Sequence, residues 1–177
     1  GDSALSLAAW RGKAEFIDLL LDKGALVPES GDKWRAGVST AASQGLTKLI
    51  RRLTGAGQDL KSVDPSGQTL LHAAAAGGSA EIVGLLVDKG FSAAAADRFG
   101  WTPLHYAARD GRGEAIRILI ERGAPLDART AMGQTSYNVA LERDMQAAVA
   151  LLAEKGADKS DIRFPVLQGD YLGQKPP

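Results

Sequence analysis

The stretch GWTPLHYAARDG, residues 100–111, decides the fold of this chain, because related stretches recur along the sequence. GQTLLHAAAAGG begins at Gly67 and GQTSYNVALERD at Gly133, while GDSALSLAAWRG begins at Gly1 and the weaker WRAGVSTAASQG at Trp34. The five copies are therefore spaced by 33 residues each time, without slippage. A fixed period of this length indicates a repeat architecture.

The first half of each unit has the signals of a short helix. Thr102 suits the N-cap, and Pro103 suits the first helical position, where no N–H is needed. Leu104 and the alanine pair that follows form an apolar stripe that lets a neighbouring helix approach closely. Gly111 is then expected to end the helix.

The second half predicts another helix, from Glu114 to Arg122, with apolar residues at Ile116, Leu119 and Ile120. Gly123 is expected to stop it. The connecting segments Asp64-Pro-Ser-Gly67 and Asp97-Arg-Phe-Gly100 place Asp and Gly as a type I turn prefers them. Each unit thus predicts a helix, a short loop, a second helix and a hairpin-like loop.

The pattern T-P-L-H-x-A-A, followed by G-A about 20 residues later at a period of 33, resembles the ankyrin repeat. The resemblance covers residues 1–159 and implies an all-α solenoid of stacked helix-turn-helix units joined by β-hairpin-like loops. Repeat 2 departs most, because Trp34 replaces the turn glycine, and repeat 5 has Asp144 in place of the helix-ending glycine. The five repeats are expected at residues 1–30, 31–63, 64–96, 97–129 and 130–159.

The two histidines occupy one slot of the repeat, since His72 and His105 lie 33 residues apart. The other repeats carry Ser6, Ser39 and Asn138 in that slot. Five hydrogen-bonding side chains in one repeated slot favour a structural duty over a catalytic base or a zinc ligand.

No enzyme motif accompanies the histidines, neither a phosphate-binding loop nor GxSxG nor HExxH. The carboxylates Glu15, Glu81 and Glu114 recur at the start of the second helix, where they interact favourably with the helix dipole. The chain has no cysteine. We therefore expect no catalysis, no cofactor and no metal.

The composition of the chain limits the kinds of partner that we expect it to bind. The 177 residues carry 21 basic and 21 acidic side chains, which gives no reason to expect nucleic acid. No run of about 18 apolar residues is present, so membrane insertion is not expected. The expected partner is another protein, or another domain of the same chain, and the chain is expected to be a monomer.

The ankyrin resemblance implies partner binding on the concave face, formed by the hairpin tips and the exposed side of each first helix. All three tryptophans of the chain fall among these positions, and Trp and Arg are enriched at binding hot spots. A surplus of basic residues on this face favours a somewhat acidic partner. The candidate partner-binding residues are Trp10, Arg11, Lys33, Trp34, Arg35, Gln44, Arg98, Phe99, Trp101, Arg109, Asp110, Met132, Gln134 and Arg143.

An alternative role is intramolecular, in which the stack docks on, or spaces, another domain of a larger protein. The tail, residues 160–177, leaves the register and carries apolar residues that could cap repeat 5. Its segment FPVLQGDYLGQKPP resembles the lead-in of bacterial WD-type β-propeller proteins of the cell envelope, which implies an exported protein. The first hairpin starts at its turn glycine, so we expect part of an upstream cap or repeat to be missing.

Overall fold

The computed structural model describes residues 3–25, 32–56, 58 and 60–159, and this part of the chain forms ten α-helices in five antiparallel pairs. The tail at residues 160–177 lies outside the described residues, so its predicted capping role stays a prediction. The pairs are α1 (Ala4–Trp10) with α2 (Ala14–Asp22), α3 (Asp32–Ser43) with α4 (Thr47–Gly55), α5 (Leu70–Gly77) with α6 (Ala80–Asp88), α7 (Pro103–Arg109) with α8 (Gly113–Glu121), and α9 (Ser136–Glu142) with α10 (Gln146–Glu154).

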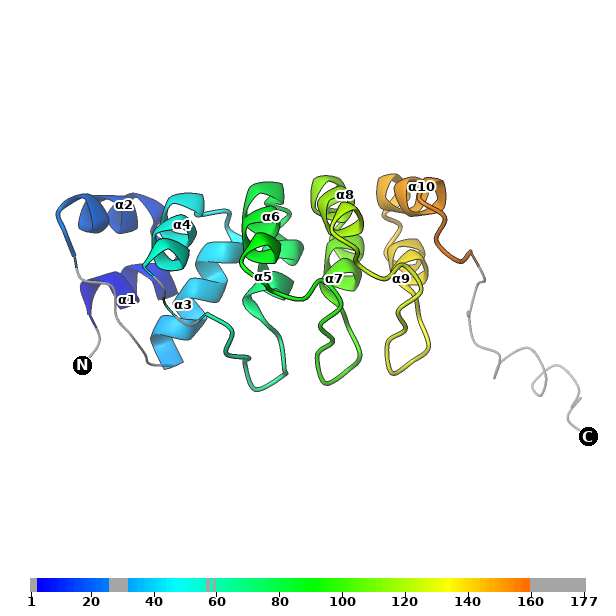
Figure 1. The fold of residues 1–177 in the computed structure, drawn as a ribbon, viewed down its shortest axis with the longest axis horizontal. Coiled ribbons are helices and arrows are strands. Elements are labelled where there is room, and N and C mark those ends of the chain that lie inside the picture. The colour runs from blue at the N-terminus through cyan, green and yellow to red at the C-terminus, as the bar shows by residue number, and fades with distance from the viewer. Residues whose placement is uncertain (1–2, 26–31, 57, 59, 160–177) are drawn as a thin grey trace, which may run out of the picture.

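The pairs stand side by side in one elongated row of two layers (Figure 1). The inner layer holds α1, α3, α5, α7 and α9, each packed on the next, and the outer layer holds the even-numbered helices. No strand occurs within the described residues. The all-α repeat solenoid expected from the sequence is confirmed, and the predicted second helix of repeat 4 begins one residue earlier than expected, at Gly113.

The core is one continuous cluster built from the same slots of successive repeats. The alanine pair of α1, α3, α5 and α7 is buried, as at Ala74–Ala75 and Ala107–Ala108, each with an exposed fraction of 0%, and α9 keeps the first of the two at Ala140. Leu71 and Leu104 are equally buried in front of these pairs. Small side chains at the contact allow the inner helices to pack closely, and the leucines fill the space between the layers.

At one contact even an alanine would be too large. A Cβ built on Gly77 of α5 would lie 2.0 Å from the carbonyl oxygen of Ser43 on α3. The backbones of these two helices therefore touch, which only glycine permits.

The loops beyond each inner helix end in a residue of left-handed conformation. Gly45, Gly78 and Gly111 have φ of 74°, 85° and 64°, and Asp144, the residue that replaces glycine in repeat 5, has φ of 56°. Asp tolerates this conformation better than most side chains because it can bond locally. The substitution at Asp144 therefore leaves the fold of repeat 5 intact.

Repeat 2 differs from the prediction at Trp34. Its equivalents Gly67, Gly100 and Gly133 have φ of 85°, 76° and 78°, a conformation that tryptophan rarely adopts. The chain forms the first turn of α3 there instead of a hairpin-like loop, and Trp34 is buried in the core with 4% of its surface exposed. The prediction of Trp34 as a partner-binding residue is therefore wrong, because its side chain is needed for packing.

Candidate functional site

The histidines are structural groups that join one repeat to the next. The N–H of Thr102 donates to Nδ1 of His105 over 3.1 Å, and the Thr102 hydroxyl lies 2.9 Å from the same nitrogen, which completes a capping box at the start of α7. Nδ1 accepts, so the proton resides on Nε2, which lies 3.1 Å from the carbonyl oxygen of Gln134 in the next repeat. His72 repeats this arrangement with Thr69 and the carbonyl oxygen of Trp101.

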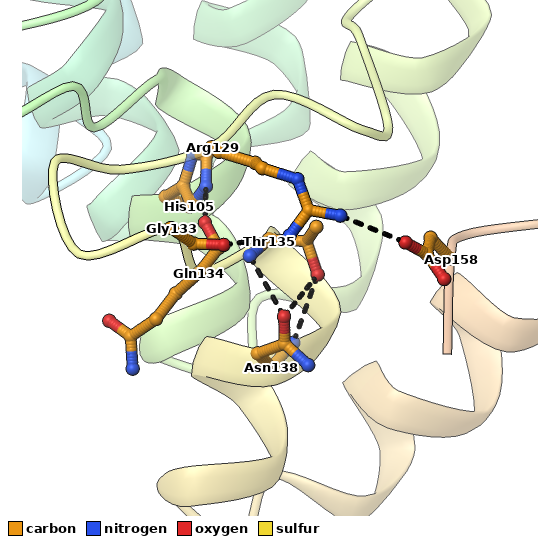
Figure 2. A network of polar contacts seen from close by, with 7 residues as sticks. All are labelled: His105, Arg129, Gly133, Gln134, Thr135, Asn138 and Asp158. Carbon is orange, nitrogen blue, oxygen red and sulfur yellow. Dashed lines mark hydrogen bonds and ion pairs between the residues drawn. The ribbon is translucent and has the colours of Figure 1, made fainter. Parts of the chain in front are cut away.

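Repeat 5 builds the same cap without a histidine (Figure 2). Oδ1 of Asn138 accepts from the N–H of Thr135 over 3.0 Å and from its hydroxyl over 2.9 Å. Nearby, Arg129 bonds the carbonyl oxygen of Gly133 and forms an ion pair of 3.0 Å with Asp158. In repeats 3 to 5 the slot thus takes His or Asn as the partner of a capping Thr, whereas Ser39 of repeat 2 lies inside α3, away from any cap.

Both histidines are held neutral by burial. His72 is 0% exposed and His105 is 1% exposed, and this burial lowers the pKa of each imidazole below its ordinary value of 6.5. Their ring nitrogens are already used in bonds to the scaffold. Both histidines therefore have a structural role, as the sequence predicts.

Three hairpin-like turns, which we call the fingers, extend from the inner layer at residues 64–67, 97–100 and 130–133 (Figure 1). The buried carboxylate of Asp97 accepts from the N–H groups of Phe99 and Trp101, each over 2.9 Å, and so fixes the middle finger. Backbone bonds from Arg98 to Ser66 and from Ala131 to Phe99 join neighbouring fingers. The finger tips are thus rigidly held.

Repeat 4 carries an aromatic and cationic cluster beside its finger. The rings of Trp101 and Tyr106 are 5.3 Å apart between centroids, and the Arg109 guanidinium lies 4.8 Å from the Tyr106 ring and 5.9 Å from the Trp101 ring. Asp110 binds that guanidinium through two bonds of 2.8 Å and 2.7 Å. The four side chains therefore support one another in one arrangement.

Tyr106 links the cluster to the finger. Its hydroxyl donates to Oδ2 of Asp97 over 2.8 Å, and its ring meets the His72 ring edge-on at 5.6 Å. Burial, followed by the bond to Asp97, raises the pKa of the phenol, so the hydroxyl stays protonated and remains a donor. Tyr106 was not among the predicted residues, although its spacing of three from Arg109 on a helix could have revealed it.

The predicted residues lie in two groups on the inner face, by which we mean the fingers and the exposed side of the odd-numbered helices. At one end, Trp10 is 48% exposed. At the other, Phe99 is 59% exposed and Met132 is 83% exposed, on adjacent finger tips. Trp101, Arg109, Asp110 and Gln134 are half-buried, Arg11, Arg35, Gln44, Arg98 and Arg143 are exposed, and the side chain of Lys33 lies outside the described residues.

Between the two groups, repeat 3 contributes small residues to the inner face. Ala73, Ala76 and Gly77 are half-buried at the slots that carry Tyr106, Arg109 and Asp110 in repeat 4. The aromatic groups of repeats 1 and 4 are therefore separated by a stretch without large side chains.

No group of three or more His, Cys, Asp or Glu side chains in the described part of the chain is placed to hold a metal ion. Among the described helices, none is long and apolar enough to cross a membrane.

The family comparison agrees with this architecture. A family model of ankyrin repeats, in three copies, matches residues 38–130 and again residues 97–162, which together cover more than half of the chain. This chain belongs to the ankyrin repeat family. Ankyrin repeats generally mediate protein–protein interaction and are typically non-catalytic. A search of curated proteins found no match.

Proposed function

We propose that this ankyrin chain is a non-catalytic module that binds another protein on its inner face, with the strongest contacts in repeat 4. The observation that carries the proposal is the packing of Trp101, Tyr106 and Arg109 on one another, beside the exposed Phe99 and Met132 on adjacent finger tips. We call these five residues the repeat 4 patch.

The energetic reason is the low cost of ordering this patch. Binding an interface side chain commonly costs about 0.5–1.5 kcal/mol of lost rotamer freedom. Asp110 already fixes Arg109, and the Arg109 guanidinium already lies over the Tyr106 ring. A partner therefore meets an Arg109 and a Tyr106 side chain that have already lost much of this freedom during folding.

The rest of the inner face supplies weaker determinants. Arg11, Arg98 and Arg143 are exposed, which favours a partner with acidic side chains at its rim. Trp10 lies three repeats away and offers a second aromatic contact. The small residues of repeat 3 leave room between them for the body of the partner.

The test compares three versions of the chain as bait in affinity capture from the source organism. The first is the native sequence, and the second carries Phe99→Ala and Trp101→Ala. The third is a matched control with Glu114→Ala and Arg117→Ala, an exposed pair on the outer helix α8 of the same repeat. Circular dichroism establishes that all three are folded.

A protein retained by the native and control baits is then purified and titrated. Hot-spot residues cost roughly 2 kcal/mol or more when truncated, so we expect Phe99→Ala/Trp101→Ala to weaken binding at least about 30-fold. The control should stay within about twofold. Equal binding to all three versions would refute the placement of the site, and a stack that resists proteolysis only within a longer parent protein would favour the intramolecular alternative.

A further inference from the structure

Repeat 5 leaves apolar side chains partly open at slots that the repeat before it buries. Tyr137 and Leu141 on α9 and Val149 on α10 are half-buried. The same slots of repeat 4 have an exposed fraction of 0%, at Leu104, Ala108 and Ile116. In repeat 4 the helices α9 and α10 pack on α7 and α8, whereas no described helix packs beyond repeat 5. We call the surface formed by Tyr137, Leu141 and Val149 the repeat 5 flank.

The chain leaves α10 in the same way as it leaves α8. Gly156 has a φ of 89°, close to the 83° of Gly123. The next residue, Ala157, is buried like Ala124, and the N–H of each alanine donates to a carbonyl oxygen of the helix before it. After α8 this path, which we call the finger path, leads to the finger at residues 130–133. The chain after α10 is therefore directed towards the next position in the row of fingers.

The row of fingers ends at a carbonyl oxygen that is ready to accept a hydrogen bond. Within the row, the N–H of Ala131 donates to the carbonyl oxygen of Phe99 over 2.8 Å. Met132 occupies the slot of Phe99 in the last finger, and no described residue donates to its carbonyl oxygen. In the 33-residue register, the residue that follows Ala131 by one repeat is Phe164.

We propose that the tail, residues 160–177, packs on the repeat 5 flank as a partial further unit of the stack. Residues 158–164 follow the finger path, and the N–H of Phe164 donates to the carbonyl oxygen of Met132. Arg129 supports the start of this path, because it binds Asp158 over 3.0 Å (Figure 2). The tail has apolar side chains to cover the flank, at Phe164, Val166, Leu167, Tyr171 and Leu172.

Prolines fit this arrangement at both ends of the row of fingers. Pro65 occupies the slot of Ala131 in the first finger, which no finger precedes because α3 runs through that part of repeat 2. Proline has no N–H, so none is left unpaired there. Phe164 occupies the same slot and keeps its N–H, which suits a position with a finger before it. Pro165 follows at a place where proline disfavours a type I turn, so the tail adds one extended segment and not a complete sixth finger.

Tail packing goes beyond the binding function proposed above and does not depend on it. Met132 lies on the last finger, beside the proposed path, whereas Phe99 lies on the finger before it. The tail therefore leaves most of the repeat 4 patch open to a partner. Partner binding and tail packing are measured by different assays, so either proposal can fail while the other holds.

Hydrogen exchange of the whole chain, followed by mass spectrometry, measures whether the tail covers repeat 5. Each unit of a repeat stack contacts only its neighbours, so loss of a cover opens the end repeat first. Phe164→Ala/Leu167→Ala should speed the exchange of the α9 and α10 amides at least about tenfold and leave those of α5 and α6 unchanged. Gln174→Ala/Lys175→Ala, in the polar end of the tail, is the matched control and should change neither.

An engineered disulfide tests the position of Phe164, since the chain has no cysteine of its own. In a glutathione redox buffer, Met132→Cys/Phe164→Cys should form its disulfide with an equilibrium constant at least about tenfold higher than Met132→Cys/Gln174→Cys, whose second site lies farther along the tail. Phe99→Cys/Ala131→Cys is the positive control, because Ala131 bonds Phe99 in the structure.

Two results would overturn the proposal. Phe164→Ala/Leu167→Ala could leave exchange in α9 and α10 unchanged, which would show that the tail continues as a linker without packing on repeat 5. Met132→Cys/Phe164→Cys could also form its disulfide no more readily than Met132→Cys/Gln174→Cys while the positive control forms.

Discussion

Replacing His105 by asparagine or by alanine separates its two structural duties. The imidazole caps α7 through Nδ1, and it joins repeat 4 to repeat 5 through Nε2. Asparagine keeps the first duty, because Asn138 performs it in repeat 5 with nearly the same distances. Alanine keeps neither.

The structure sets the size of each effect. The carbonyl oxygen of Gln134 also accepts from the N–H of Thr130 over 2.9 Å, so losing the His105 bond does not leave it unpaired. His105→Asn should therefore cost about 1 kcal/mol, the net value of one hydrogen bond. His105→Ala should cost about 3 kcal/mol, because it also removes a cap, which contributes about 1 kcal/mol, and leaves a cavity at a buried position.

Urea unfolding at pH 7.5, followed by circular dichroism, measures both variants against the parent chain. If the slope of the free energy of unfolding against urea concentration is unchanged, the variants differ from the parent in stability and not in the surface exposed on unfolding. Asn138→Ala is the matched control in repeat 5, and it should lose at least the value of a cap, about 1 kcal/mol. If asparagine and alanine at position 105 cost the same, the capping role assigned to Nδ1 is wrong.

Four more outcomes follow from particular contacts. Burial lowers the pKa of His72 and His105, so the unfolded chain binds more protons than the folded chain below about pH 6.5. The free energy of unfolding should therefore fall with pH there, by at most about 1.4 kcal/mol per pH unit for each histidine. Urea unfolding at pH 7.5 and 5.5 should show a smaller loss in the variant His72→Asn/His105→Asn. Trp34→Ala should lower the free energy of unfolding by about 3–5 kcal/mol, whereas Trp10→Ala should lower it by less than about 1 kcal/mol, since only Trp34 is buried; equal losses in urea would contradict the packing role of Trp34. Gly77→Ala should cost about 1–3 kcal/mol, because its Cβ would meet the Ser43 carbonyl, while Gly113→Ala, which meets nothing within 4 Å, should be close to neutral in the same assay. Asp144→Gly should raise the melting temperature, since glycine removes the cost of the positive φ, which is at most about 1 kcal/mol for Asp; an unchanged or lower value would show that the Asp144 side chain contributes more than its backbone costs.

The regular repeats could be predicted from sequence because their signals are local. Thr102, Pro103 and Gly111 determine where α7 begins and ends, and the 33-residue register carries the same interpretation to the other repeats. The shared slot of His72 and His105 indicates a structural role from the sequence alone. The partners of these histidines could not be predicted, since Trp101 and Gln134 offer backbone carbonyls, which leave no trace in side-chain identity.

Trp34 and Tyr106 show where sequence reasoning failed. Trp34 occupies the slot of a turn glycine, so the sequence predicts a turn there with an exposed tryptophan ring. In the structure the Trp34 ring is buried in the core, and α3 already runs through the position where the turn is expected. Tyr106 was overlooked because its slot carries alanine in repeat 3 and buried valine in repeat 5, at Ala73 and Val139.

A comparison of equivalent slots in repeats 3 and 4 indicates which residues could determine the choice of partner. Capping, alanine and glycine slots are dictated by the fold, so they cannot distinguish one partner from another. The slots of Phe99, Tyr106 and Arg109 carry Ser66, Ala73 and Ala76 in repeat 3, although both repeats fold alike. Repeat 3 therefore forms its two helices with small side chains in these slots. The stacking of Arg109 on Tyr106, anchored by Asp110 and Asp97, therefore supports our proposal that repeat 4 presents this surface to a partner.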